Sequence, residues 1–180
     1  MPQPDLLLQM TCDVAADISL LPDAAGVYVF FWARPLIPLC DYCAEAETIS
    51  PEIELVPLYT GASADSLRMR IKRHVLGDTR GSTLRASLGL LLQAHLNLTI
   101  IPIPTKAYFC FEPEQRLTDW IVSNTVIGHF ETDDPFGLEK GMLADEAGLL
   151  NIQGCPATEI SVRLKTLRSN ASGRLLPLPH

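Results

Sequence analysis

Residues 26–32 read Gly-Val-Tyr-Val-Phe-Phe-Trp, and they form the first strand expected in the chain. β-branched and aromatic residues dominate it, which is the composition of a buried strand. A turn signal at residues 20–23 precedes it, and a second strand candidate covers residues 54–59 and closes at Gly61. The intervening residues 33–53 carry prolines and acidic side chains and are interpreted as a loop or insertion. We therefore expect an antiparallel hairpin with an unusually long connection.

The hydrophobic period changes after the second strand. Apolar residues recur every four positions from Leu67 to Val75, which predicts one face of a helix over residues 65–76. Arg70 and His74 are also four residues apart, so they are expected to share a neighbouring face of that helix.

The rest of the chain alternates short helical and strand patterns. The pair Asp134-Pro135 indicates a helix start, because aspartate is a strong N-cap and proline fits the first turn. The order of elements predicts a single α+β domain over residues 1–180, a small antiparallel sheet of three or more strands flanked by helices. Helices are expected over 82–95, 114–124, 135–146 and 156–168, strands over 99–103, 107–111 and 126–132, and a frayed tail from 169.

The composition bounds the class of protein. At 180 residues, with 47% apolar and 19% charged residues, the chain fits one folded soluble domain rather than a disordered segment. The net charge of −7 argues against a protein that simply coats nucleic acid, yet residues 62–110 carry seven Lys/Arg against two Asp/Glu. Such a local basic face can hold a phosphate backbone, while the acidic remainder discourages indiscriminate binding.

Neither a membrane span nor a secretion signal is predicted. The most apolar tract, residues 86–104, is interrupted by polar residues, and the N-terminus lacks a basic start and a cleavage site. Five cysteines without framework spacing indicate free thiols in a reducing, cytoplasmic setting. Cys40 and Cys43 have the spacing of half a zinc knuckle, but a second pair is missing, so no zinc site is expected.

Six residues spread over most of the chain form a candidate active site. They comprise two tyrosines, an arginine, a histidine, a carboxylate and an amide, a set that suits metal-assisted cleavage of a phosphodiester. Taken singly, each has a simpler explanation: a strand aromatic, a solvated helix face, a carboxylate favoured by the helix dipole, or a turn residue. The six residues are Tyr28, Tyr59, Arg70, His74, Glu139 and Asn151.

Two short motifs give the chain a resemblance to a known family. Gly-Val-Tyr at residues 26–28 and Tyr-Thr-Gly at residues 59–61 resemble the paired motifs of the GIY-YIG nucleases, with valine and threonine in place of the isoleucines. The resemblance implies a three-stranded antiparallel sheet flanked by helices, with one tyrosine on each of the first two strands. It covers residues 26–151 as a core and makes residues 33–53 an insertion between those strands.

The later residues keep the intervals of the same family. Arg70 matches the arginine of the helix that follows the second motif, with Arg68 as the competing position. His74, four residues on, matches the histidine of the homing-endonuclease branch. Glu139 resembles the metal-binding glutamate. Asn151, twelve residues later, resembles the asparagine of the repair-nuclease branch and joins the expected catalytic set.

The resemblance implies a role for each group. Glu139 would hold one Mg²⁺ (or Mn²⁺) that keeps several waters and acts as a Lewis acid. Arg70 would give a planar fork of donors to the non-bridging phosphate oxygens. Tyr59 would accept a proton from water, Tyr28 would position groups or act as an alternative acid or base, and His74 would bind a phosphate or assist a tyrosine. A tyrosine pKa of about 10 is high for a base, so the metal and Arg70 would have to lower it.

Further polar residues are expected to contact nucleic acid. Two arginines besides Arg70 lie on the helix over residues 65–76. The run Arg-Gly-Ser-Thr-Leu-Arg at residues 80–85 places three more polar groups at a helix N-terminus, a natural phosphate cradle, although it also fits an ordinary capped turn. These candidate contacts are Arg68, Arg73, Arg80, Ser82 and Arg85.

The sequence thus predicts a divalent-metal-dependent endonuclease that hydrolyses phosphodiester bonds, with DNA favoured over RNA. The alternative is a catalytically inactive module of the same fold that binds nucleic acid or protein, in keeping with the acidic surface and the altered second motif. A toxin-like nuclease would differ in biological role rather than in chemistry. A homodimer or a protein partner stays open, because little beyond the core would provide specific recognition.

Overall fold

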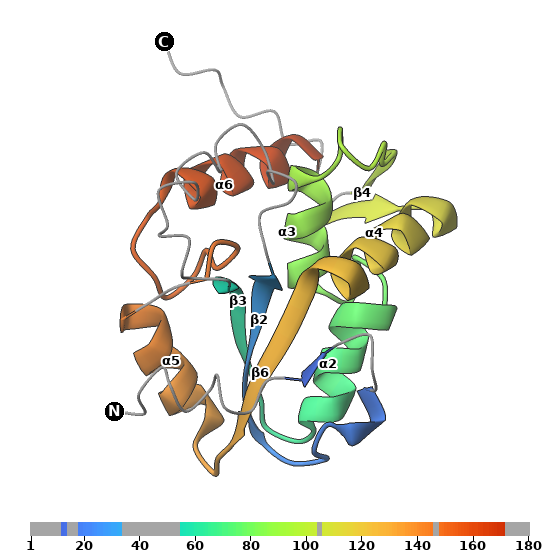
Figure 1. Ribbon diagram of the computed structural model, residues 1–180. Helices are drawn as coiled ribbons and strands as arrows, with labels where there is room; N and C mark the ends of the chain where they lie inside the picture. The colour runs from blue at the N-terminus through green and yellow to red at the C-terminus, as the bar shows by residue number, and fades with distance from the viewer. Residues whose placement is uncertain (1–11, 14–17, 34–54, 104–105, 146–147, 172–180) are drawn as a thin grey trace.

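The computed structural model describes residues 12–13, 18–33, 55–103, 106–145 and 148–171. Its main sheet has the strand order β1-β6-β2-β3, and every neighbouring pair is antiparallel. Together with the flanking helices in Figure 1, this sheet confirms the predicted α+β class. The strands of the main sheet are β1 (Cys12–Asp13), β2 (Gly26–Ala33), β3 (Leu55–Ser63) and β6 (Thr125–Glu131), and a second sheet pairs β4 (Ile100–Ile103) with β5 (Lys106–Phe109).

The predicted hairpin is confirmed, and its second strand is longer than expected. Strand β2 pairs with β3 along its whole length. The sequence placed the end of the second strand at Tyr59, but pairing continues to Ser63. Gly61 therefore lies inside the strand, directly opposite Tyr28, rather than in a turn. Most of the expected insertion at residues 33–53 lies outside the described residues.

The helices start at residues whose side chains suit helix N-termini. Ser66, Ser82 and Asp134 each accept a hydrogen bond from the backbone N–H three positions later. All the predicted helices are present, although the one expected over 82–95 is shorter and the last one is shifted by three residues. None of the helices in the described part of the chain is long and apolar enough to cross a membrane. The helices are the 3₁₀ turn η1 (Ile18–Leu20), α2 (Leu67–Leu76), α3 (Thr83–Leu91), α4 (Phe111–Asn124), α5 (Pro135–Asp145) and α6 (Glu159–Ala171).

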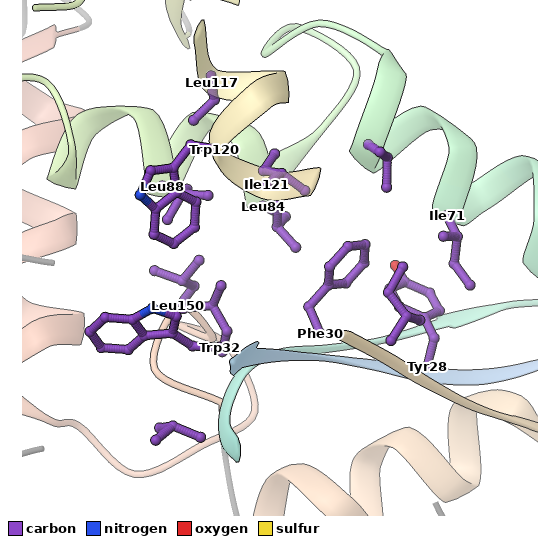
Figure 2. Close-up of a cluster of buried hydrophobic side chains, with 14 of the residues drawn as sticks. Tyr28, Phe30, Trp32, Ile71, Leu84, Leu88, Leu117, Trp120, Ile121 and Leu150 are labelled. Atoms are coloured by element: carbon purple, nitrogen blue, oxygen red, sulfur yellow. The ribbon is translucent and has the colours of Figure 1, made fainter. Parts of the chain in front are cut away.

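The main sheet carries an apolar layer on each face. Tyr28, Phe30 and Trp32 alternate along β2 and pack against buried leucines, isoleucines and a tryptophan of α2, α3 and α4, as Figure 2 shows. Val27 and Phe31 point to the other face and pack against α5. Figure 1 shows α5 on one side of the sheet and α2 on the other. Because β2 is buried on both faces, its sequence is apolar throughout instead of alternating with polar residues.

A bulge in β3 decides which face Tyr59 occupies. The register between β2 and β3 shifts by one residue at Leu58, which has no partner of its own in β2. Strict alternation would place Tyr59 on the face opposite to Val56 and Leu58. With the extra residue, Leu58 and Tyr59 both pack against the layer that contains Tyr28. The two tyrosines therefore lie on the same side of the sheet.

A buried ion pair joins the helices behind this layer. Arg85 is fully buried and donates hydrogen bonds to the carboxylate and the backbone carbonyl of Glu114, at 2.7 and 2.8 Å. The same guanidinium donates to the carbonyl of Val75 at 2.7 Å, at the C-terminal end of α2. Thr79 donates to the other carboxylate oxygen through its N–H and its hydroxyl. The predicted contact between Arg85 and nucleic acid is therefore wrong, because its guanidinium is directed into the fold.

Candidate active site

Tyr28 is the centre of a hydrogen-bonded cluster on one face of the sheet. Its hydroxyl lies 2.7 Å from Nε2 of His74 and accepts a longer bond, 3.4 Å, from Nε of Arg70. Nδ1 of His74 lies 2.7 Å from the hydroxyl oxygen of Ser82. The cluster links β2, α2 and the residue that caps α3, so it fixes Tyr28 and Arg70 relative to each other.

His74 lies inside the protein rather than on a solvated helix face. It is fully buried, and its ring packs against the rings of Phe30 and Tyr59. Burial lowers the pKa of His74 to about 3, and the charge of Arg70 adds to this effect. The ring is therefore neutral at neutral pH, with one nitrogen a donor and the other an acceptor. Since His74 has no exposed surface for a phosphate, the role that fits its position is assistance to Tyr28.

Gly61 is required by the position of the Tyr28 ring. The two residues face each other across β2 and β3. A Cβ atom at position 61 would lie 2.4 Å from the Tyr28 hydroxyl oxygen and 2.6 Å from Cζ of that ring. These separations are shorter than van der Waals contact, so a side chain at position 61 would displace the phenol. The glycine of the Tyr-Thr-Gly motif thus makes room for the tyrosine of the Gly-Val-Tyr motif.

Tyr59 and Glu139 line an open polar cleft beside this cluster. The cleft has a volume of about 250 Å³ and is also bordered by Asn151 and Arg168. Glu139 projects from α5, the helix that packs beside β3 and β2 in Figure 1. It is half-buried and does not enter the apolar core, and its charge interacts with that of Arg70. The fold therefore brings the predicted carboxylate to the predicted arginine and tyrosines.

Burial governs the protonation of the cluster. It raises the pKa of Tyr28 and of Tyr59, and the charge of Arg70 offsets only part of that effect. Burial also raises the pKa of Glu139, again against the opposing influence of Arg70. Burial disfavours the charged form of Arg70, but the two tyrosines and Glu139 outweigh it and raise the arginine pKa. At neutral pH the cluster therefore holds two neutral phenols beside a guanidinium.

Asn151 binds the edge of strand β3. Its side-chain amide donates to the carbonyl of Thr60 at 2.8 Å, and its Oδ1 accepts from the N–H of the same residue at 2.9 Å. The preceding residue, Leu150, donates its N–H to the carbonyl of Leu58 at 2.8 Å. The segment from Gly148 to Asn151 thereby covers an edge that would otherwise be unpaired. Because both polar atoms of the Asn151 side chain are used on Thr60, Asn151 positions the strand that carries Tyr59.

Comparison with models of protein families matches residues 26–170 to the GIY-YIG catalytic domain. The match covers most of the chain and includes every residue of the cluster. The chain belongs to the GIY-YIG family. This membership confirms the resemblance seen in the sequence, and it implies nuclease-type activity and binding of nucleic acid. Neither the curated proteins nor the solved structures gave a match to the chain.

The chemistry of Glu139 suits the metal ion that the GIY-YIG family implies. Glu139 is the acidic residue that lines the cleft. Within the described residues no group of three or more His, Cys, Asp and Glu side chains could hold a metal ion. Mg²⁺ needs few protein ligands, because it keeps several of its waters, so one carboxylate in an open polar cleft fits it. A cation beside Glu139 would also counter the desolvation that raises its pKa.

Three of the arginines predicted to contact nucleic acid reach the surface of the GIY-YIG domain. Arg73 is exposed and lines a groove with Arg70. Arg80 is exposed and forms an ion pair of 2.9 Å with Asp78. Arg68 is half-buried and donates one hydrogen bond of 2.8 Å to a backbone carbonyl. Their contact with a substrate stays a prediction.

Ser82, in contrast, is buried, and the prediction that it contacts nucleic acid is wrong. Only 2% of its surface is exposed. Its hydroxyl oxygen accepts the N–H of Arg85 as the cap of α3 and bonds to Nδ1 of His74. The capped-turn interpretation of residues 80–85 is therefore correct for this serine, which supports His74 from behind.

Arg168 lines the cleft and was not predicted as a site residue. It lies on α6, beyond the expected core over residues 26–151. A basic residue in the last turn of a helix is also the ordinary placement that complements the helix dipole. No local sequence pattern distinguishes an arginine that lines a cleft from one that complements the helix dipole. Only the packing of α6 shows that Arg168 lines the cleft.

The predictions on cysteines concern residues in different parts of the chain. Cys110 and Cys155 are free thiols, as expected. Cys40 and Cys43 lie outside the described residues, so the absence of a zinc site there stays a prediction.

Proposed function

We propose that this GIY-YIG domain is a divalent-metal-dependent endonuclease that hydrolyses phosphodiester bonds, in DNA ahead of RNA. The supporting observation is that Tyr59 and Glu139 line one cleft and that the charge of Arg70 acts on both. Metal-dependent hydrolysis of a phosphodiester requires proton transfer, neutralisation of developing charge and a place for the metal ion. Phenols, a guanidinium and a carboxylate meet these three requirements in turn.

Arg70 would bind the phosphate to be cleaved. Its Nε already donates to the Tyr28 hydroxyl, which orients the planar guanidinium. The outer edge of that plane would donate to non-bridging phosphate oxygens, and charge-assisted bonds of this kind strengthen as negative charge develops on the phosphorus group. A Mg²⁺ or Mn²⁺ ion at Glu139 would supply Lewis-acid stabilisation of the same charge.

The two tyrosines differ in what surrounds their hydroxyl groups. Tyr59 lines the open cleft, where it would face the attacking water and accept its proton. The Tyr28 hydroxyl is connected through neutral His74 to Ser82, and a neutral imidazole can receive a proton at one nitrogen while giving one up at the other. Tyr28 would therefore hold Arg70 in place or act as an alternative acid or base. Since burial raises the pKa of both phenols, their action as bases depends on the positive charge brought to the cleft.

Plasmid nicking tests the proposal. The full chain is assayed with Mg²⁺, with Mn²⁺ and with EDTA, on supercoiled DNA and on a structured RNA. Glu139→Gln and Arg70→Ala are each expected to reduce the rate by about 10²- to 10³-fold, as the loss of a charge-stabilising group typically does. The matched controls are Asp145→Asn, exposed on α5, and Lys72→Ala, exposed on α2, which should keep the wild-type rate.

Three results would contradict the proposal in whole or in part. Equal nicking by the wild type and by both site variants would mean that the activity belongs to a contaminant or to another site. Binding of DNA by the wild type without any cleavage, under all metal conditions, would favour the inactive binding module instead. Faster cleavage of RNA than of DNA would overturn the order of substrates but leave the chemistry intact.

A further inference from the structure

Arg168 is the second arginine of the cleft. It comes from α6 and lies with Tyr59 and Glu139 along the same surface. The positive charges of Arg70 and Arg168 both lower the pKa of Tyr59, against the larger effect of its burial. Tyr59 is thus the phenol on which both arginines act, one from α2 and one from a helix almost a hundred residues later in the chain.

The Ser87 hydroxyl holds the Arg168 side chain in the cleft. Ser87 donates its own proton to the backbone carbonyl of Thr83 at 2.8 Å. Its oxygen is therefore free to accept, and it accepts a hydrogen bond from Nη2 of Arg168. This bond fixes one nitrogen of the guanidinium, and the side chain as a whole lines the cleft.

Among the residues that the structure describes, Arg168 lacks the carboxylate partner that Arg85 has. Arg85, which is structural, has a carboxylate and several carbonyls as acceptors. Among the described residues, Arg168 forms no ion pair with a carboxylate, and its hydrogen-bond acceptor is the hydroxyl of Ser87. A half-buried cation without an anion is unfavourable, and an anionic ligand would relieve this. Because Arg168 lies beside the proposed catalytic groups, this anion would be part of the substrate.

We propose that Arg168 binds a phosphate group of the nucleic-acid strand in the Tyr59–Glu139 cleft, so that the substrate is held by two arginines, Arg70 and Arg168. This inference rests on the proposed function. The ligand chemistry is a phosphodiester oxygen, for which a planar guanidinium is better suited than a lysine ammonium. Helix α6 then becomes part of the substrate-binding surface rather than a packing element alone.

Binding of fluorescent DNA across a series of salt concentrations tests the inference. The full chain carries Glu139→Gln in every sample to prevent cleavage, and anisotropy gives the affinity. Loss of one phosphate contact should lower the slope of log K against log salt by about one, and the affinity by roughly tenfold. Arg168→Gln is expected to show both effects. Lys165→Gln, which removes an exposed charge from the same helix, should show neither.

A second variant separates substrate contact from folding. Arg168→Lys keeps the charge, so its salt slope should match the wild type, while its cleavage rate without the Glu139 substitution should fall several-fold because the planar fork is lost. Urea unfolding of each variant shows whether it is folded. If Arg168→Gln does not fold, the rate of Arg168→Lys decides, and a wild-type rate would overturn the inference.

The outcomes distinguish this inference from the proposed function. If the wild type cleaves DNA and Arg168→Gln matches Lys165→Gln in affinity, slope and rate, the role of Arg168 is refuted and the nuclease proposal stands. If the wild type binds DNA without cleaving it, the nuclease proposal fails, and the salt slope alone decides on Arg168. If the wild type neither binds nor cleaves nucleic acid, both proposals fail.

Discussion

Replacement of Arg85 by methionine tests whether this arginine stabilises the fold rather than binding substrate. Sequence reasoning placed Arg80 and Arg85 together at one phosphate cradle. The structure separates them: the side chain of Arg85 is fully buried in an ion pair with Glu114, whereas that of Arg80 is 59% exposed. Arg85→Met should therefore affect the stability of the fold, and Arg80→Met should affect only the binding of substrate.

The magnitude follows from the burial of the pair. The Glu114 side chain is 11% exposed, so removal of the guanidinium leaves its carboxylate buried without a counter-ion. Breaking a buried ion pair in this way destabilises a protein by about 3–5 kcal/mol. The carbonyl of Val75 at the end of α2 also loses its donor. With an m-value of about 2 kcal/mol per molar urea, the unfolding midpoint should fall by roughly 2 M.

Urea unfolding followed by tryptophan fluorescence measures this change. Trp32 and Trp120 are 1% and 5% exposed, so both report the loss of the core. The double variant Arg85→Met with Glu114→Gln should lose less stability than the sum of the two single variants, because no buried charge is left unpaired. A midpoint for Arg85→Met no lower than that of Arg80→Met would refute the structural role.

Three further predictions concern the site. Gly61→Ala should lose about 1–3 kcal/mol of stability and most of the nicking rate, because its Cβ would fall 2.4 Å from the Tyr28 hydroxyl oxygen. Urea unfolding and plasmid nicking, measured on one preparation, check the two effects. Asn151→Ala should destabilise the protein by about 1–3 kcal/mol, since it leaves the N–H and carbonyl of Thr60 unpaired. Unchanged hydrogen exchange at the Thr60 amide would contradict the role of Asn151 in holding β3. The His74 pKa of about 3 lies below the unfolded value of 6.5, so stability from neutral His74 is complete above pH 6.5 and is lost as pH falls toward 3. The loss is roughly 1.4 kcal/mol per pH unit, and His74→Gln should flatten the urea midpoint across that window.

Local patterns were sufficient to place most of the elements. Asp134 caps its helix through a bond that reaches only three residues along the chain, so the sequence alone identifies it. The dense apolar run at residues 26–32 likewise predicts a buried strand. The family motifs add the identity of the catalytic candidates, and the structure places Arg70 and Glu139 where their charges interact.

The orientation and burial of individual side chains could not be predicted from the sequence. The periodicity of α2 put Arg70 and His74 together on a face next to the apolar one, but it did not show that Arg70 is half-buried and His74 fully buried. Arg85 has the same side chain as Arg80 and lies five residues away, yet it lies in the interior because Glu114, on α4, supplies its counter-charge. A partner that is distant in the chain leaves no trace in the local pattern.

The α+β class, the helix start at Asp134, the family and the identity of the catalytic candidates could be inferred from the amino-acid sequence, because each of these depends on residues close together in the chain or on a motif. The tertiary structure was needed to show that a bulge at Leu58 brings Tyr59 to the side of Tyr28, and that α6 brings Arg168 to the cleft that Tyr59 lines. A shift of one residue in register moves a side chain to the other face of a sheet, and the packing of a distant helix follows from the whole core. Strand register and helix packing both depend on contacts between distant segments, so the sequence of one segment does not determine them.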